Sequence, residues 1–315
     1  MQLRTNTMAI NAHRNIGITG SGMMQAMHRL SSGFRINTAA DDPAGLAISE
    51  TMRAQIRGLD QASRNAQDGI SMLGTAEAAV ISVQSMLQRI REIIIQAAND
   101  TNNVTNREAL QMEVNELMAE IDLVSSAAMF NNRPLLSGSH APGTSTGDDL
   151  WLQTGPNPGQ GMTVNIGAVS VYHIDQATFT DAALGSSTDP NFRFAFHALR
   201  SFPHSSDPSS PPMQPGFVGM DGVDIARFQP VLDAAIDHIN MERASLGAMQ
   251  NRLEFTTRSL DVASENLQDA ESRIRNADMA LEMMRFVRYQ VLQQTGMMVL
   301  AQANRAPGTF LELLG

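Results

Sequence analysis

The chain has 315 residues, 43% of them hydrophobic and only 5% aromatic, so it can form a packed core but has few of the large rings common in globular enzymes. The absence of Cys excludes disulfides, thiolate zinc sites and thiol nucleophiles. The net charge of −10 argues against nucleic-acid binding, which needs a basic surface, and no apolar run reaches the ~18 residues of a membrane span.

The basic residues are unusual, because all 22 are Arg and Lys does not occur. Two explanations stay open, a compositional bias of the genome and an alkaline exterior, since Lys loses its charge at about pH 10 while Arg keeps it. The first twenty residues contain Arg4 and Arg14 and no continuous apolar segment, so no cleavable secretory signal is predicted.

The amino end predicts a helix with a narrow apolar seam. Its residues are separated by seven, four, three and four positions: Ile16, Met23, Met27, Leu30 and Phe34. Gly17, Gly20 and Gly22 weaken this helix, since each costs about 1 kcal/mol relative to Ala in a helix interior. The Ser-Ser-Gly at 31–33 is expected to end it.

Two further helices are predicted before residue 131. The Asp-Asp-Pro at 41–43 supplies a cap followed by Pro at the first helical position, and a long apolar seam runs from there to about Asn99. Thr105 and Glu108 have the spacing of a capping box at the start of the next amphipathic helix. A short turn between two such helices predicts an antiparallel hairpin.

In the middle of the chain, at about 139–222, the apolar period changes to two. Short strands are predicted at 150–154, 162–166 and 169–174, separated by Gly and Pro turns. The Pro-rich stretch 201–219 is expected to be an exposed loop.

The stretch 246–298 keeps a seven-residue apolar repeat, which is typical of helices that supercoil against partners. One seam position contains Leu246, Leu253, Leu260, Leu267, Ile274 and Leu281, and the other contains Met249, Met284, Val291 and Met298, with small residues between them. Gly and Pro are absent between Gly247 and Gly296, so one continuous helix of roughly 75 Å is predicted.

The predicted fold is mainly α: an elongated coiled-coil-like helical rod with both termini paired and a small β or irregular insert in mid-chain. The predicted domains are terminal helices at 1–40 and 275–315, a long helical bundle at 41–138 and 224–274, and a surface-exposed insert at 139–223. A narrow seam cannot be covered by one pairing of helices in a monomer, so packing between subunits is expected. The predicted self-assembly residues are Ile16, Met23, Met27, Leu30, Phe34, Ile274, Leu281, Met284, Val291 and Met298.

No catalytic, cofactor-binding or metal-binding residues are predicted. The seven His are scattered, and His197 and His204 have no carboxylate at ligand spacing. Asp41 and Asp42 could act as an acid–base pair, but beside Pro43 they favour the structural interpretation of a helix cap.

Both ends resemble bacterial flagellin. The residues that carry the resemblance are LSSGFRINTAADDPAGLAISE at 30–50 and MRAQIRGLDQASRNAQDGI at 52–70, then LGAMQNRL at 246–253, ENLQDAESRIRNADMA at 265–280 and VLAQAN at 299–304. The resemblance implies a structural, non-enzymatic subunit of the extracellular filament used for swimming, with terminal helices in an inner tube and long helices in an outer tube. It also implies secretion of unfolded subunits by the type III flagellar export apparatus.

The resemblance implies further partners. These are other flagellin subunits, an export chaperone on the carboxy end after about Arg275, and the filament cap and hook-junction proteins. LQRIREIIIQ at 87–96 matches the stretch read by the flagellin-sensing Toll-like receptor of hosts, which makes Arg89, Glu92, Ile93 and Glu113 candidate receptor or subunit contacts. Ile93 replaces the usual Leu and Ile94 the usual Ala, and a plain solvated face remains the alternative.

Two other functions are kept open. One is a hook–filament junction protein of the same superfamily, which usually lacks the VLAQAN ending. The other is a binding module or enzyme in which the insert acts on a helical stalk. For a filament subunit, the two ends are expected to gain order on assembly, since alone they bury too little to offset about 1 to 2 kcal/mol of ordering per residue.

Overall fold

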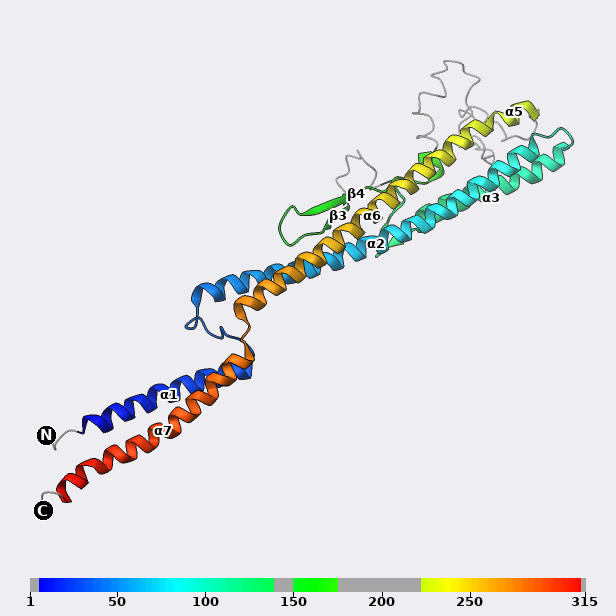
Figure 1. Ribbon diagram of the computed structural model, residues 1–315. Helices are drawn as coiled ribbons and strands as arrows, with labels where there is room; N and C mark the ends of the chain where they lie inside the picture. Colours follow the sequence, from blue (N-terminus) through cyan, green and yellow to red (C-terminus); the bar gives the residue numbers. More distant parts are fainter. Residues whose placement is uncertain (1–5, 139–149, 175–221, 313–315) are drawn as a thin grey trace. The chain divides into compact units, whose positions relative to one another are not determined.

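The computed structural model describes residues 6–138, 150–174 and 222–312 (Figure 1). The chain divides into two units. The terminal unit combines residues up to Gly58 with those from Val262 onward, and the central unit is Leu59–Asp261. The predicted insert 139–223 lies mostly outside the described residues, as do His197, His204 and the loop 201–219.

In the terminal unit, α1 (Thr7–Ser32) ends where its sequence predicts. The Asn6 side chain caps it by accepting a hydrogen bond from the Ala9 backbone N–H at 3.1 Å. At the other end Gly33 has a φ of 76° and donates its N–H to the Arg29 carbonyl at 2.8 Å. Only glycine adopts this left-handed conformation without strain, so Gly33 fixes the end of α1.

The long helix α2 (Pro43–Ala97) starts at the predicted Asp-Asp-Pro. Asp42 Oδ1 accepts the Gly45 backbone N–H at 2.9 Å, as a helix cap does. The Asp41 carboxylate turns the other way and accepts the backbone N–H groups of Asn37 and Thr38 at 3.2 and 3.0 Å. The two carboxylates are therefore used structurally, one for the helix and one for the loop before it.

The predicted continuous helix at 246–298 is wrong, because the chain breaks between α6 (Phe228–Arg275) and α7 (Met279–Glu312). Asp278 caps α7, and its Oδ1 accepts the N–H groups of Ala280 and Leu281 at 3.0 and 3.1 Å. The Ala277 N–H donates to the Gly33 carbonyl at 2.9 Å, so the loop after α1 holds the break open. A capping Asp and a partner backbone thus override the heptad pattern.

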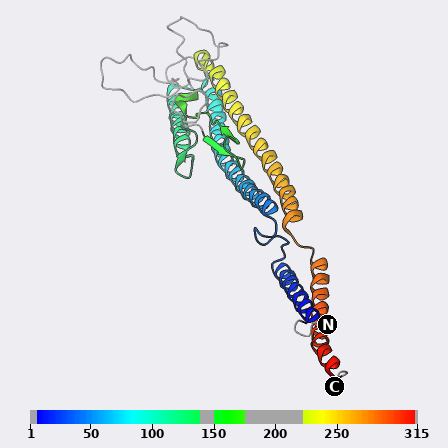
Figure 2. The same cartoon turned by 90° about the vertical axis from the view of Figure 1, so that its left-hand side faces the viewer.

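The core of the central unit lies between the seams of α2, α6 and α3 (Val104–Ala127). Its fully buried side chains lie on the predicted apolar seams, except for Met118: Leu73, Val80, Val83, Leu87, Ile90 and Ile94 on α2, Val114, Met118 and Ile121 on α3, and Leu232, Ile239 and Leu253 on α6. Helices α2 and α3 form the predicted antiparallel hairpin (Figures 1 and 2). The cap of α3 is Asn103, which accepts the Asn106 N–H at 2.8 Å, so the predicted capping box at Thr105 and Glu108 is wrong.

Two small hairpins and a short helix complete the described part of the central unit. Strands β1 (Met129–Phe130) and β2 (Arg133–Pro134) are joined by Asn131 and Asn132, both at positive φ, and were not predicted. Strands β3 (Leu150–Gln153) and β4 (Gly161–Val164) pair antiparallel where two strands were predicted. Helix α5 is Gly222–Ala226.

The predicted strand at 169–174 is wrong. Its end is a helical turn in which the N–H groups of His173 and Ile174 both donate to the Ser170 carbonyl at 3.0 Å. The Ser170 hydroxyl lies 2.7 Å from His173 Nδ1, and Asp122 accepts the Val171 N–H at 3.0 Å. These side-chain hydrogen bonds favour the turn over the alternating pattern.

Helix α2 contains an 18-residue stretch of mean hydropathy 1.3, long and apolar enough by composition to cross a membrane. A third of the stretch is buried, however, and its buried apolar side chains, such as Val80, Val83 and Leu87, belong to the core of the central unit. A core helix passes the same test of length and hydropathy, so the stretch is weak evidence for a membrane span.

Candidate self-assembly site

Helices α1 and α7, from opposite ends of the chain, lie side by side in the terminal unit (Figures 1 and 2). Glycine lets them approach: a Cβ on Gly22 would lie 2.7 Å from the Tyr289 ring, and one on Gly296 would lie 2.9 Å from Ile16 Cγ1. The Asn6 side-chain amide donates to the Ala303 carbonyl across the pair at 2.8 Å. Gly22, which weakens the helix by propensity, is therefore also where the partner helix fits closely.

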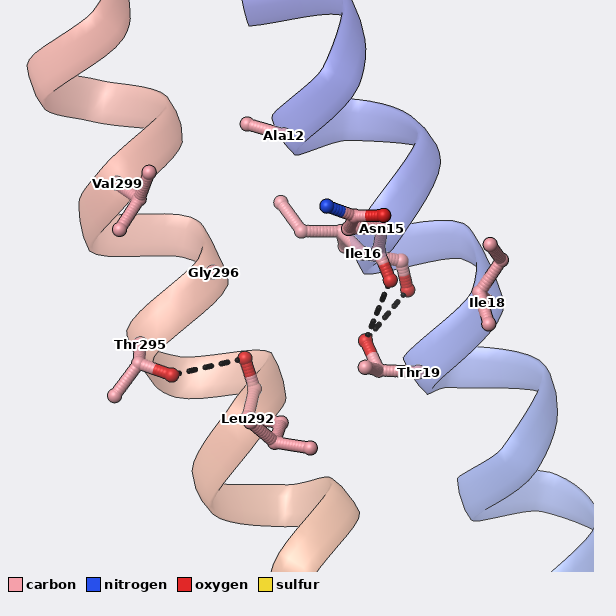
Figure 3. A pocket seen from close by; sticks show the side chains of 9 residues that line it. All are labelled: Ala12, Asn15, Ile16, Ile18, Thr19, Leu292, Thr295, Gly296 and Val299. Carbon is pink, nitrogen blue, oxygen red and sulfur yellow. Dashed lines mark hydrogen bonds between the residues drawn. The ribbon is translucent and has the colours of Figure 1, made fainter. Parts of the chain in front are cut away.

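A shallow pocket of about 370 Å³ lies between the two helices (Figure 3). It is lined by Ala12, Asn15, Ile16, Ile18 and Thr19 of α1 and Leu292, Thr295, Gly296 and Val299 of α7. The Thr19 and Thr295 hydroxyls donate to carbonyls of their own helices at 3.0 to 3.1 Å. With its hydroxyls occupied, the pocket offers mainly an apolar surface, suited to packing and not to chemistry.

The predicted self-assembly residues fall into two groups. Ile16, Met23, Leu30, Phe34 and Ile274 are partly buried within the terminal unit. Met27 and the α7 residues Leu281, Met284, Val291 and Met298 are exposed, with 64%, 51% and 65% of the last three accessible. Much of the α7 seam is therefore left uncovered by the described residues.

Further apolar side chains of the same helices are exposed and were missed by the seam analysis. They are Met8, Ile10, Ile18 and Met24 of α1, and Met279, Met283, Val287, Leu292, Met297 and Val299 of α7. Among the residues of α1 and α7 whose side chains are described, only Ala12, Ala26, Glu282 and Ala303 are buried. The signal in the sequence was the even spread of apolar residues around α7, which a search for a single stripe overlooks.

A buried carboxylate joins α1 to α7. Glu282 is 3% exposed, and its Oε1 lies 2.6 Å from Arg285 and 3.5 Å from Arg29, both through Nη1. Arg29 also lies 3.6 Å from Asp41 in the loop after α1. This chain of charges ties the first turn of α7 to the end of α1.

A second charge cluster surrounds Phe34 at the helix break. The Cζ atoms of Arg275 and Arg53 lie 5.0 and 5.8 Å from the ring centre, within the range of cation–π attraction. Arg275 pairs with Glu50 at 2.6 Å, and Arg53 pairs with Glu271 at 3.1 Å. The hydrogen bond from Arg275 lowers the pKa of Glu50. Phe34, predicted as a seam residue, thus anchors the break.

The loop carboxylate Asp41 is held ionised by its hydrogen bonds. The backbone N–H of Thr38, followed by that of Asn37 and the side chains of Gln25 and Thr38, lowers the pKa of Asp41 to about 2, against the opposing effect of its partial burial. The loop conformation therefore depends on the charged form of this side chain.

The predicted contact residues of the central unit lie at the α2–α3 surface, except one. Arg89 donates through Nε to Glu113 at 2.8 Å and through Nη1 to Glu92 at 2.9 Å, and these carboxylates raise its pKa, Glu113 most strongly. Ile93 is fully buried in the core, because its position on α2 faces the helical interior. As a surface contact, the prediction for Ile93 needs correction, and this residue is a packing residue.

Two paired helices from opposite ends of a chain, with apolar faces uncovered, are typical of a protein that packs against other protein chains. Residues 3–141 match the family model described as the bacterial flagellin N-terminal helical region, and residues 230–314 match that of the bacterial flagellin C-terminal helical region. The chain belongs to the bacterial flagellin family.

Full-length relatives agree with this assignment. The chain is 43% identical over 314 residues to a flagellin of Halalkalibacterium halodurans and 40% identical over 322 residues to a flagellin of Bacillus subtilis, each comparison covering 100% of both chains. Among solved structures, a putative flagellar hook-associated protein from Vibrio parahaemolyticus matches with a TM-score of 0.52 and 15% identity, over 75% of this chain and 100% of that one. That structure supports the fold alone.

The family and its full-length relatives make the chain a structural subunit of the flagellar filament, an extracellular appendage built by self-polymerisation. The prediction of a filament subunit is confirmed.

Proposed function

We propose that the terminal unit is the part of the subunit through which copies pack in the interior of the filament. The observation that carries the proposal is the exposed row Met284, Val291 and Met298 on α7. Burying apolar surface contributes about 25 cal/mol per Å², so each of these side chains would stabilise the assembly when a neighbouring copy covers it.

The test is a charge placed on the row. Val291→Glu is expected to abolish seeded polymerisation, measured by sedimentation, because an unpaired carboxylate would be buried between copies. Val104→Glu is the matched control, because Val104 is 56% exposed and Val291 is 51% exposed. Val104 is at the start of α3, where a Glu is favourable near the helix amino end, so this variant is expected to polymerise normally. Normal polymerisation of Val291→Glu would contradict the proposal.

A second proposed role belongs to the Arg89 surface, defined as Arg89, Glu92 and Glu113. The three side chains form an exposed network in which one guanidinium is held by two carboxylates, so it presents a fixed charge pattern to a host Toll-like receptor or to the next subunit. Ile93 is left out of this surface, because it is buried.

This role is tested with two arginines of the same helix. Arg89→Ala is expected to reduce both receptor signalling and filament yield. Arg91→Ala is the control, because Arg91 is equally exposed at 49% but pairs with Asp233 of α6, at 2.8 Å. Equal behaviour of the two variants would leave Arg89 as an ordinary residue of a solvated face.

The proposal extends to the path by which the subunit leaves the cell. Unfolded export through the flagellar apparatus needs a chaperone that covers the apolar row of α7 before assembly, and filament cap and hook-junction proteins would meet the same helices outside. Slower hydrogen exchange of α7 in a complex with the chaperone is the expected result. Unchanged exchange in α7 would place the chaperone elsewhere.

A further inference from the structure

Methionine supplies an unusual share of the exposed apolar surface of the terminal unit. Eight of its exposed large apolar residues are Met: Met8, Met24, Met27, Met279, Met283, Met284, Met297 and Met298. Among the described residues of the central unit, Met72, Met118 and Met162 are buried, and the exposed Met residues are Met112, Met129 and Met241. Thioethers accessible to solvent are the ones that oxidants reach.

Met284 and Met298 occupy a special place among these residues. They are fourteen positions apart, with Val291 midway between them. Each step of seven residues falls only about 20° short of two full turns of an α-helix. The two sulfurs therefore lie on nearly the same face of α7, on the row that carries the proposed packing. The described residues leave most of both side chains uncovered, since Met284 is 64% and Met298 65% exposed.

We propose that Met284 and Met298 are oxidation sites whose modification by peroxides controls the assembly competence of the subunit. Hydrogen peroxide transfers one oxygen atom to the thioether sulfur. The O–O bond breaks, an S–O bond forms, the sulfur is oxidised by two electrons to the sulfoxide, and the peroxide is reduced to water. A flexible apolar side chain becomes a polar one at two points of the row.

The consequence for assembly rests on the proposed function of the terminal unit. A sulfoxide buried between copies without a hydrogen-bond partner opposes packing, and we expect the critical concentration for seeded growth to rise about tenfold. Once copies have packed, the same sulfurs are covered. Peroxide would thus inactivate free subunits and spare finished filament.

The experiment uses the full chain in three forms: unaltered, Met284→Leu with Met298→Leu, and Met112→Leu with Met241→Leu as the control. Met112 and Met241 are 63% and 62% exposed, so they meet peroxide as readily as the α7 pair. Leu conserves volume and apolar character and cannot be oxidised in this way. Monomers are treated with hydrogen peroxide, freed of it with catalase, mapped for sulfoxides by mass spectrometry and then grown on seeds.

We expect peroxide to raise the critical concentration of the unaltered chain and of the control about tenfold, and that of the α7 variant less than about twofold. Treatment with methionine sulfoxide reductases and a dithiol should restore growth, since the sulfoxide oxygen then leaves as water while the dithiol becomes a disulfide. Equal sensitivity of the α7 variant, or normal growth of chains oxidised at both sites, would overturn the proposal.

A parallel treatment of finished filaments separates this inference from the function on which it rests. If Met284 and Met298 oxidise as fast in filaments as in monomers, the row is not buried between copies and the proposed packing fails. If they are protected in filaments but their oxidation leaves monomer growth unchanged, the packing stands and only the oxidation control fails.

Discussion

Both units contain helices with apolar seams, but the seams are buried in the central unit and partly exposed in the terminal unit. In the central unit the seams of α2, α3 and α6 face one another, and Leu87, Ile90 and Leu253 are fully buried. In the terminal unit α1 and α7 pair with each other, and Met284, Val291 and Met298 of α7 remain exposed. The comparison teaches that a heptad repeat specifies a packing face without saying whether the partner is in the same chain. A seam is buried within the chain only where enough helices of the same chain pack together to cover it.

The largest expected effect comes from the core of the central unit. Ile90→Ala removes side-chain atoms from a fully buried position and is expected to lower the free energy of unfolding by about 2 to 5 kcal/mol. Trp151 is the only Trp of the chain and lies in this unit, so its fluorescence during denaturant unfolding reports the change.

Val291→Ala is the counterpart in the terminal unit. Because Val291 is half exposed, its truncation is expected to change monomer stability by less than about 0.5 kcal/mol while raising the critical concentration for assembly. A loss of monomer stability as large as that of Ile90→Ala would erase the distinction between the two units.

A large effect is also expected from the buried carboxylate of the terminal unit. Glu282→Gln removes the charge that faces Arg29 and Arg285. Because Arg29 keeps Asp41 at 3.6 Å, the loss of this carboxylate is expected to destabilise the terminal unit by about 1 to 3 kcal/mol. Faster hydrogen exchange in α1 and α7 would report it. The control is Glu265→Gln, at an exposed position of α6 in the same unit, which should leave hydrogen exchange unchanged. If Glu282→Gln also left hydrogen exchange unchanged, the ion pairs of Glu282 would not stabilise the terminal unit.

Much of the fold follows from local sequence. The carboxy end of α1 and the start of α2 were predictable because Gly33 and Asp42 act through nearby backbone groups. The core of the central unit was predictable because apolar steps of three and four residues fix a buried face. The seam position that contains Met284, Val291 and Met298 was predictable for the same reason, although only the structure shows that these proposed packing residues are exposed beside α1.

Three of the errors share a physical cause, which is contact between segments distant in sequence. The break before α7 depends on Ala277 bonding to Gly33, and the turn at Ser170 depends on Asp122, far along the chain in both cases. Ile93 looked like a surface residue by resemblance, but its burial is set by the helices packed around α2. Patterns within one segment carry no information on such partners.

A smaller effect is expected from replacing Arg by Lys at the helix break. Arg275→Lys should leave filaments intact at neutral pH but make them dissolve at about pH 10.5, because a Lys ammonium facing Glu50 loses its proton near there while Arg keeps its charge. Sedimentation at the two pH values measures this. Filaments of the unaltered chain should stay intact to about pH 11, and so should those of the control Arg273→Lys, which is at an exposed position two residues away. If these filaments dissolved at the same pH as those of Arg275→Lys, Arg would give no advantage at alkaline pH.

The smallest expected effect is a local change of the loop at Asp41 at acidic pH. Its pKa of about 2 lies below the ordinary 3.8, so the charged form stabilises the loop at 37–41. This stabilisation is fully present above about pH 4 and is lost as the pH falls through about 2. With ¹⁵N-labelled Asn, the amide resonance of Asn37, which donates to Asp41, should titrate with a midpoint near 2 in the unaltered chain and show no such step in Asp41→Asn. Because the central unit takes no part in this loop, Trp151 fluorescence should not follow the transition. A midpoint at the ordinary value would mean that Asp41 does not accept the backbone hydrogen bonds, and the loop that holds the helix break would need another explanation.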